Sequence, residues 1–156
     1  MRGRNLKQKI IWLVSKITLP VIRLYWFVFR PKNYGVKCMI ENRGEILLVR
    51  HTYGKGLWTL PGGTISRNED PESAVKREIK EELGIEINNF KKIGELFDDS
   101  EYVKDYITCF SASVGSREMR IDKNEILETR WFTLDNLPPL SNISKRILSL
   151  WQGSKK

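Results

Sequence analysis

Residues 63–85 read GTISRNEDPESAVKREIKEELGI, and their order predicts a glycine turn, a short loop and one helix. Asp70 is a favourable N-cap residue, and Pro71 is a favourable first residue of a helix. Gly84 is the residue type that most often follows the end of a helix. The stretch therefore predicts a helix over Pro71–Leu83.

The predicted helix has an apolar side and an acidic side. At roughly 100° per residue, one stripe suited to packing on a sheet consists of Val75, Ile79 and Leu83. Three carboxylates gather on another side, those of Glu78, Glu81 and Glu82. Clustered carboxylates raise a pKa or bind a cation, and oxygen ligands suit Mg²⁺ or Mn²⁺ better than zinc. A solvent-facing helix rich in Glu, Lys and Arg is the plain alternative.

The spacing across the whole stretch decides between these two interpretations. Five residues separate Gly63 from Glu69, and seven separate Glu69 from Arg77. The chain then continues as Arg-Glu-Ile, one residue, Glu-Glu, one residue and Gly-Ile, ending at Ile85. This is a complete match to the Nudix box, and the preceding Leu-Pro-Gly-Gly at 60–63 is similar to the usual lead-in. The chain thus resembles a Nudix hydrolase.

The resemblance implies a metal-dependent hydrolysis at a phosphoanhydride. Members of the family cleave the pyrophosphate linkage of a nucleoside diphosphate joined to another group, and the implied cofactor is Mg²⁺ or Mn²⁺. Divalent cations neutralise the phosphates, orient them and acidify the attacking water. The metal ligands that the resemblance implies are the Gly62 carbonyl and the side chains of Glu78, Glu81 and Glu82.

Other residues are implied to support or complete this catalytic set. Arg77 would orient the carboxylates, and Glu69 and Gly63 would support that arrangement from the loop. For Arg77, an ordinary i,i+4 pair with Glu81 is the alternative. The residue that takes the proton from water varies within the family: it lies in the box itself, as Glu81 or Glu82 would, or it precedes the last strand, where this chain has Glu125. Glu125 fits an ordinary loop charge equally well.

The substrate depends on residues outside the box, and several classes stay open. His51, Tyr53 and Trp58 flank a glycine-containing loop and can stack on a base, although Trp58 also fits a core position. Tyr102 lies 17 residues after Ile85, a spacing that resembles diadenosine polyphosphate hydrolases, but a lone strand tyrosine is usually core. The candidate substrates are a nucleoside triphosphate, a dinucleoside polyphosphate, and ADP-ribose or a sugar nucleotide. The alternatives from another class are a nucleotide-binding module without activity and a membrane-surface adaptor whose N-terminal helix is the functional part.

The net charge of +8 belongs to the N-terminal segment. Residues 1–40 hold nine basic residues and no acidic one, whereas the other 116 residues hold 18 basic and 19 acidic ones. This distribution argues against a nucleic-acid partner for the globular part. Within 1–30, basic residues recur every seven positions beside an apolar run, at Arg2, Lys9, Lys16, Arg23 and Arg30.

Such a basic stripe is typical of a helix lying on an anionic membrane. Packing of the same segment on its own domain or on a second subunit, in a homodimer, is equally compatible with the pattern. Two charges and a central proline argue against a membrane span. We expect an N-terminal helical segment over 1–32, a catalytic domain over 33–156, and a cytoplasmic protein that is peripheral at the inner membrane face if the stripe binds lipid.

The rest of the pattern predicts a mixed α/β class. The strands that we expect are 35–40, 46–50, 85–87, 92–97, 102–114 and 126–134, with 33–35 as a linker and a C-terminal helix capped by Ser141. Cys38 and Cys109 show no metal spacing and are expected as reduced core residues. The resemblance adds the Nudix α/β/α sandwich, with the box helix on one face of a mixed sheet and the C-terminal helix on the other.

Overall fold

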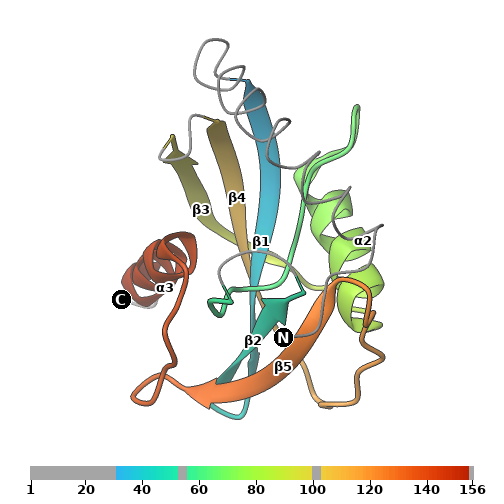
Figure 1. Ribbon diagram of the computed structural model, residues 1–156, viewed down its shortest axis with the longest axis vertical. Helices are drawn as coiled ribbons and strands as arrows, with labels where there is room; N and C mark the ends of the chain where they lie inside the picture. The colour runs from blue at the N-terminus through green and yellow to red at the C-terminus, as the bar shows by residue number, and fades with distance from the viewer. Residues whose placement is uncertain (1–30, 53–55, 100–102, 155–156) are drawn as a thin grey trace, which may run out of the picture.

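The computed structural model describes residues 31–52, 56–99 and 103–154. Its elements, in chain order, are β1 (Lys32–Asn42), β2 (Glu45–His51), α2 (Pro71–Leu83), β3 (Lys91–Asp98), β4 (Lys104–Ser113), β5 (Ile126–Thr133) and α3 (Asn142–Ser154) (Figure 1). Residues 1–30 of the expected N-terminal helical segment lie outside the described residues, and Lys32, its expected last residue, instead begins β1. Among the described helices, none has the length and apolar character needed to cross a membrane.

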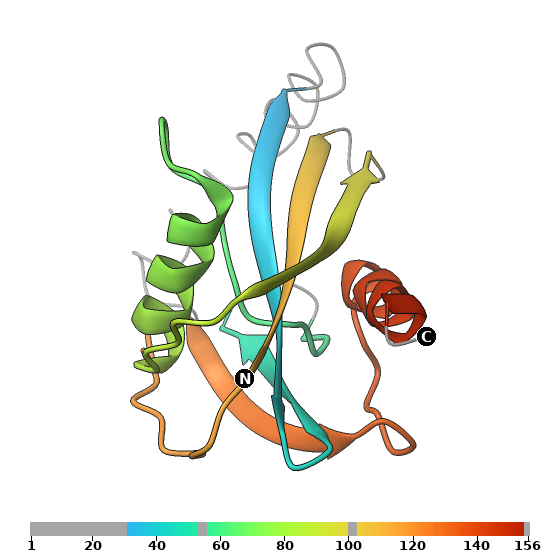
Figure 2. The same cartoon turned by 180° about the vertical axis from the view of Figure 1, so that it is seen from behind.

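The five strands form one mixed sheet in the order β3-β4-β1-β2-β5. β1 and β4 run parallel, and the pairs β1–β2, β2–β5 and β3–β4 are antiparallel. Helix α2 covers one face of the sheet and α3 covers the other, as the two opposite views show (Figures 1 and 2). The predicted α/β/α sandwich is therefore confirmed.

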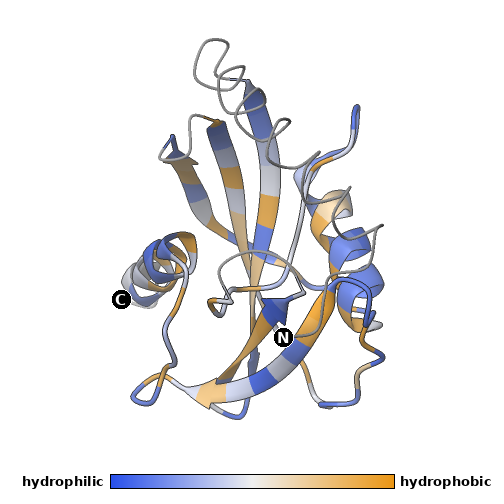
Figure 3. Cartoon of the chain, viewed as in Figure 1, coloured by the Kyte–Doolittle hydropathy of each residue, from blue (hydrophilic) through white to orange (hydrophobic). Residues whose placement is uncertain are grey.

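Two apolar cores hold the layers together, one on each face of the sheet. Apolar and polar bands alternate along β3 and β4 (Figure 3), as expected for strands whose successive side chains point to opposite faces. In β1, Val36 and Cys38 pack in the α2-side core, whereas Met39 packs in the α3-side core. Cys38 and Cys109 are both buried and free of disulfides, as expected.

Helix α2 has the predicted bounds because its signals are local. The Asp70 carboxylate accepts hydrogen bonds from the backbone N–H groups of Glu72 and Ser73, both at 3.0 Å. Gly84 adopts a left-handed φ of 66° and donates its N–H to the Lys80 carbonyl at 3.0 Å. These contacts satisfy backbone groups that a helix end otherwise leaves without a partner.

The segment at 58–65 fills a gap between β1 and β2. These two strands pair only through Glu41↔Ile46 and Asn42↔Glu45. Beyond that point the segment bonds to both, through Cys38 N–H to Pro61 O and Val36 N–H to Gly63 O on β1, and through the Val49↔Thr59 bridge on β2. Because the segment bonds to both strands, its glycine turn, Gly62–Gly63, is held in a fixed position beside α2.

Three predicted segments differ from the structure. The pairing of β1 with β4, which are far apart in the sequence, explains the differences at the starts of these two strands. Residues 33–35 are no linker, because β1 already begins at Lys32 and pairs with β4 from Lys32↔Lys104 to Glu41↔Ser113. β4 begins at Lys104, so Val103, which was predicted as part of this strand, lies before it, and Tyr102 lies outside the described residues. Residues 85–87 form no strand; Ile87 instead packs its side chain into the α2-side core.

Candidate active site

The glycine turn lies directly against the acidic side of α2. The Gly62 N–H donates a hydrogen bond to Glu82 Oε2 at 2.9 Å, and only 3% of the Glu82 side chain is exposed. Gly62 has a φ of 123°, and a Cβ at this position would lie 2.4 Å from the Val36 carbonyl oxygen. Only glycine therefore fits between β1 and the helix at this point.

Gly63 is required for a different reason. A Cβ there would lie 2.3–2.7 Å from the carboxylate atoms of Glu78. The Glu78 carboxylate thus fills the space that any larger residue at 63 would take. The two glycines place the carboxylates of Glu78 and Glu82 beside the same turn.

We expect Gly63→Ala to reduce turnover without unfolding the protein. The new methyl group would displace the Glu78 carboxylate, and a misplacement of about 1 Å in a catalytic constellation costs roughly a hundredfold in rate. The displaced atoms end a flexible side chain, so the Tm should change by less than about 3 °C. Gly115→Ala is the control, because no atom lies within 4 Å of a Cβ there. Equal activity of the two variants would contradict the placement of Glu78.

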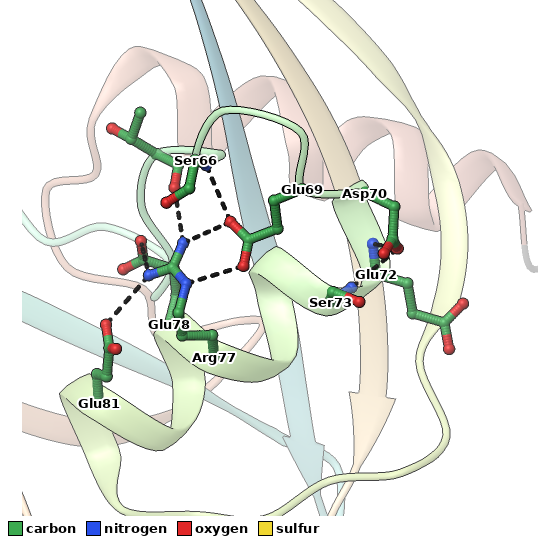
Figure 4. Close-up of polar contacts among 9 residues, drawn as sticks. Ser66, Glu69, Asp70, Glu72, Ser73, Arg77, Glu78 and Glu81 are labelled. Carbon is green, nitrogen blue, oxygen red and sulfur yellow. Dashed lines mark hydrogen bonds and ion pairs between the residues drawn. The ribbon is translucent and has the colours of Figure 1, made fainter.

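Arg77 connects the loop to the carboxylates through five hydrogen bonds (Figure 4). Its Nε and Nη2 donate to both oxygens of Glu69 at 2.9 and 2.8 Å. Nη1 donates to Glu78 at 2.8 Å and to Glu81 at 3.1 Å, and Nη2 also donates to the Thr64 carbonyl at 3.0 Å. The i,i+4 pair with Glu81 is therefore one contact of a larger hydrogen-bonded cluster. This cluster consists of Arg77, Glu69, Glu78 and Glu81, and it joins the loop to helix α2.

The hydrogen bonds within this cluster keep Glu69 and Arg77 ionised. Hydrogen bonds from Arg77 and from the Ser66 N–H lower the pKa of Glu69 to about 2, and the carboxylates raise the pKa of Arg77. Glu69 thus stays ionised and holds the guanidinium in place, which in turn orients Glu78. The resemblance implies a supporting role for both residues, and these contacts are compatible with that role.

The three glutamates of the box differ in exposure. The side chains of Glu82 and Glu78 are 3% and 14% exposed, whereas that of Glu81 is 60% exposed and contacts Arg77. Glu78 and Glu82 therefore face the glycine turn, whereas Glu81 lies on the solvent side of the Arg77 cluster. Figure 4 shows Glu81 approaching the guanidinium from the helix turn below it.

Lys37 belongs to the same site, although it was not among the residues predicted from the sequence. Its Nζ donates to the Gly62 carbonyl at 2.6 Å. Burial lowers the pKa of Lys37, and the charges of Glu82 and Glu78 oppose that shift. The signal in the sequence was a lysine inside an otherwise apolar strand, VKCMI at 36–40.

His51 and Glu125 are two further residues that act on Glu82. The His51 Nε2 is 4.0 Å from Glu82 Oε1, and burial followed by the Lys37 charge lowers the pKa of the imidazole. Glu125 is exposed on the loop before β5, and its carbonyl accepts from the Thr52 N–H at 2.9 Å. The Glu125 charge acts on Glu82, so both residues lie within electrostatic reach of the box.

Burial raises the pKa of Glu82 to about 7. Lys37 and the Gly62 N–H favour the ionised form, whereas Glu78 and Glu125 disfavour it. A buried carboxylate next to a second carboxylate is a site that a divalent cation would stabilise.

The raised pKa predicts a pH dependence of stability for the protein in a chelator. Because the folded-state pKa of about 7 exceeds the ordinary 4.5, the contribution of Glu82 is fully present below 4.5 and is lost as the pH rises through 7. Urea unfolding with EDTA should therefore show Glu82→Gln gaining stability relative to wild type between about pH 5 and pH 8. A difference that does not change with pH would contradict this assignment.

A cleft of about 710 Å³ opens at the site. Part of its lining comes from the glycine turn and its neighbours, with the residues Gly35, Lys37, His51, Gly62 and Gly63. Another part of the lining comes from β4 and the start of α3, with the residues Asp105, Ile107, Ser141, Asn142 and Ile143. Its size suits a nucleotide, and it brings the glycine turn together with residues more than 40 positions away in the sequence.

The remaining candidates for substrate binding have different positions. His51 lines the cleft, whereas Trp58 is buried in the α3-side core, where its ring meets Phe132 edge-on at 5.1 Å. Tyr53 and Tyr102 lie outside the described residues. Trp58 was proposed either to stack on a base or to lie in the core, and the structure places it in the core.

The donors at the turn fit a hard divalent cation. Within the described part of the chain, no group of three His, Cys, Asp or Glu side chains is arranged to hold a metal ion alone. Mg²⁺, however, is usually bound by one or two carboxylates together with waters and substrate phosphates. The carboxylates of Glu78 and Glu82 and the Gly62 carbonyl meet that requirement.

A mixed sheet between two helices, with a glycine turn set against a glutamate-bearing helix, defines the Nudix class of folds. The family model for the NUDIX domain matches residues 31–151, so the chain belongs to this family. Relatives include NAD-capped RNA hydrolase NudC of Vibrio vulnificus, 32% identical over 103 residues, which cover 65% of this chain and 39% of that protein. NudC of Salmonella typhi is 32% identical over 113 residues, which cover 70% of this chain and 43% of that protein. The chain thus spans less than half the length of these relatives.

Solved structures agree with the fold. A MutT NUDIX hydrolase from Burkholderia pseudomallei is 30% identical, with a TM-score of 0.70 over 76% of this chain and 97% of that one. The MutT protein of Methanosarcina mazei is 25% identical, with a TM-score of 0.71 over 81% and 98%. The NUDIX domain of Shewanella oneidensis NrtR, solved with ADP ribose, is 18% identical with a TM-score of 0.68 over 81% and 89%, and supports the fold alone.

Proposed function

We propose that this chain is a Mg²⁺- or Mn²⁺-dependent hydrolase that cleaves the pyrophosphate linkage of a nucleoside diphosphate joined to another moiety. The observation that carries the proposal is the pair of carboxylates of Glu82, which is buried, and Glu78, which is partly buried. Both are held beside the Gly62–Gly63 turn, and that turn lines the cleft. Family membership supports a hydrolase of phosphoanhydrides.

The residues would divide the work as follows. Glu78, Glu82 and the Gly62 carbonyl would hold the divalent cation, which neutralises phosphate charge and acidifies water when bound. Arg77 and Glu69 would keep Glu78 in place. Glu81 would reach a metal-bound water from the outer side, and Glu125 or a box glutamate would accept the proton from the attacking water.

Two substrate classes have specific support. Relatives named NAD-capped RNA hydrolase favour a dinucleotide with a central pyrophosphate, free or attached to RNA. Solved MutT proteins at 25–30% identity favour a nucleoside triphosphate. The chain spans less than half of the NudC relatives, so the first class rests on the shared domain alone.

A substrate panel with Mg²⁺ and with a chelator tests the proposal. The panel comprises NAD, NAD-capped RNA, ADP-ribose, a dinucleoside polyphosphate, oxidised dGTP and 5′-triphosphate RNA. We expect mononucleotide or pyrophosphate release from at least one of them, abolished by EDTA and restored by excess Mg²⁺. Nucleotide binding without turnover would support the binding-module alternative and overturn the enzyme.

We also propose that residues 1–30, which lie outside the described residues, associate with an anionic membrane surface. The seven-residue repeat of basic residues supports this proposal. Co-sedimentation of the full chain with phosphatidylserine vesicles, compared with a chain lacking 1–30, tests it. Equal sedimentation would overturn it, and a concentration-dependent dimer lost in the shorter chain would favour packing between two copies.

A further inference from the structure

Lys37 occupies an unusual position for a charged residue. It lies between Val36 and Cys38, whose side chains are buried in the α2-side core. Because side chains alternate along a strand, that of Lys37 points to the opposite face, where it lines the cleft. A half-buried ammonium needs a partner that offsets its lost hydration.

The partner is the residue that the family resemblance implies as a backbone metal ligand. Lys37 Nζ donates to the Gly62 carbonyl at 2.6 Å, while the N–H of the same glycine donates to Glu82 at 2.9 Å. Gly62 is thus held by an ammonium through its carbonyl and by a carboxylate through its N–H. The charges of Glu82 and Glu78 both act on Lys37, with Glu82 acting more strongly.

We propose that Lys37 is a positioning residue that lowers the affinity of the substrate-free site for a divalent cation, so that the cation binds tightly only together with the phosphates of the nucleotide. This inference rests on the proposed metal site. A fixed positive charge repels an incoming dication and occupies one of the oxygen atoms that the dication would use. Bound phosphates add negative charge beside both cations and offset that repulsion.

The size of the effect follows from Coulomb's law. A unit charge and a dication separated by several ångströms repel by enough to change an affinity about tenfold even at the dielectric constant of water. Most damage to a metal site weakens metal binding. Tighter binding after removal of Lys37 is therefore a result that a merely structural role would not produce.

Calorimetric titration of the full chain with Mg²⁺ alone, near neutral pH, tests the proposal. Lys37→Met removes the charge, and Lys37→Gln removes it while keeping a donor for the Gly62 carbonyl. We expect both to bind Mg²⁺ about tenfold more tightly than wild type. Lys37→Arg keeps the charge and should stay within about threefold of wild type. Lys80→Met is the matched control, because Lys80 is exposed on α2 and pairs with Glu86.

A second titration, with a non-hydrolysable α,β-methylene nucleotide present, measures the coupling. Wild type should gain more Mg²⁺ affinity from the nucleotide than the two neutral variants do. Unchanged or weaker Mg²⁺ binding in a folded neutral variant would overturn the role of Lys37 and leave the hydrolase proposal intact. If wild type bound no Mg²⁺ with or without nucleotide, the metal site itself would be overturned. Should Lys37→Met fail to fold, Lys37→Gln carries the test.

Discussion

Glu82→Gln is expected to reduce Mg²⁺-dependent turnover by about a thousandfold or more. The substitution keeps the size of the side chain and leaves an oxygen that can accept the Gly62 N–H. It removes the negative charge that faces the turn from the most buried position of the box. An amide is a poor ligand for a hard dication, so phosphate neutralisation and water activation should both fail.

The fold should survive this change, and two measurements separate the two effects. Circular dichroism and the Tm of Glu82→Gln should match those of wild type at acidic pH, where Glu82 is protonated in both the folded and unfolded states. Glu72→Gln is the control, since Glu72 is an exposed residue in the first turn of the same helix. Turnover retained in Glu82→Gln would refute the assignment of Glu82 as a metal ligand.

The sequence predicted what depends on neighbours along the chain. Asp70, Pro71 and Gly84 determine the ends of α2 through contacts within a few residues, so its bounds were predicted correctly. The spacing of the box likewise placed Glu78 and Glu82 on one side of the helix, and the turn that meets them is connected to α2 by a short loop.

What the sequence could not predict depends on residues that are far apart in the chain. The start of β1 is set by β4, some 70 residues later, and the same pairing helps to form the cleft. Lys37 enters the site because β1 and β2 splay and the turn fills the gap between them. Helical geometry grouped Glu81 with the other two glutamates. In the structure, however, its side chain is mostly exposed and contacts Arg77.

Gly62→Ala is expected to lower the free energy of unfolding by about 3 kcal/mol, or roughly 10 °C in Tm. The left-handed φ of 123° already disfavours a side chain. In addition, the Cβ would lie 2.4 Å from the Val36 carbonyl oxygen and 3.0 Å from the Lys37 Cα. These are backbone atoms of a central strand, and they cannot move aside without breaking the pairing of β1 with β4.

Gly44→Ala separates the two causes. Gly44 also has a left-handed φ, of 83°, but a Cβ there would meet no atom within 4 Å. It should therefore show only the conformational cost of about 1 kcal/mol, and the additional loss in Gly62→Ala then measures the collision with β1. Thermal and urea unfolding of both variants give the comparison. If Gly62→Ala were no less stable than Gly44→Ala, the turn would be free to move away from β1. The close approach that holds Glu82 and Lys37 on either side of Gly62 would then not be a rigid feature of the site.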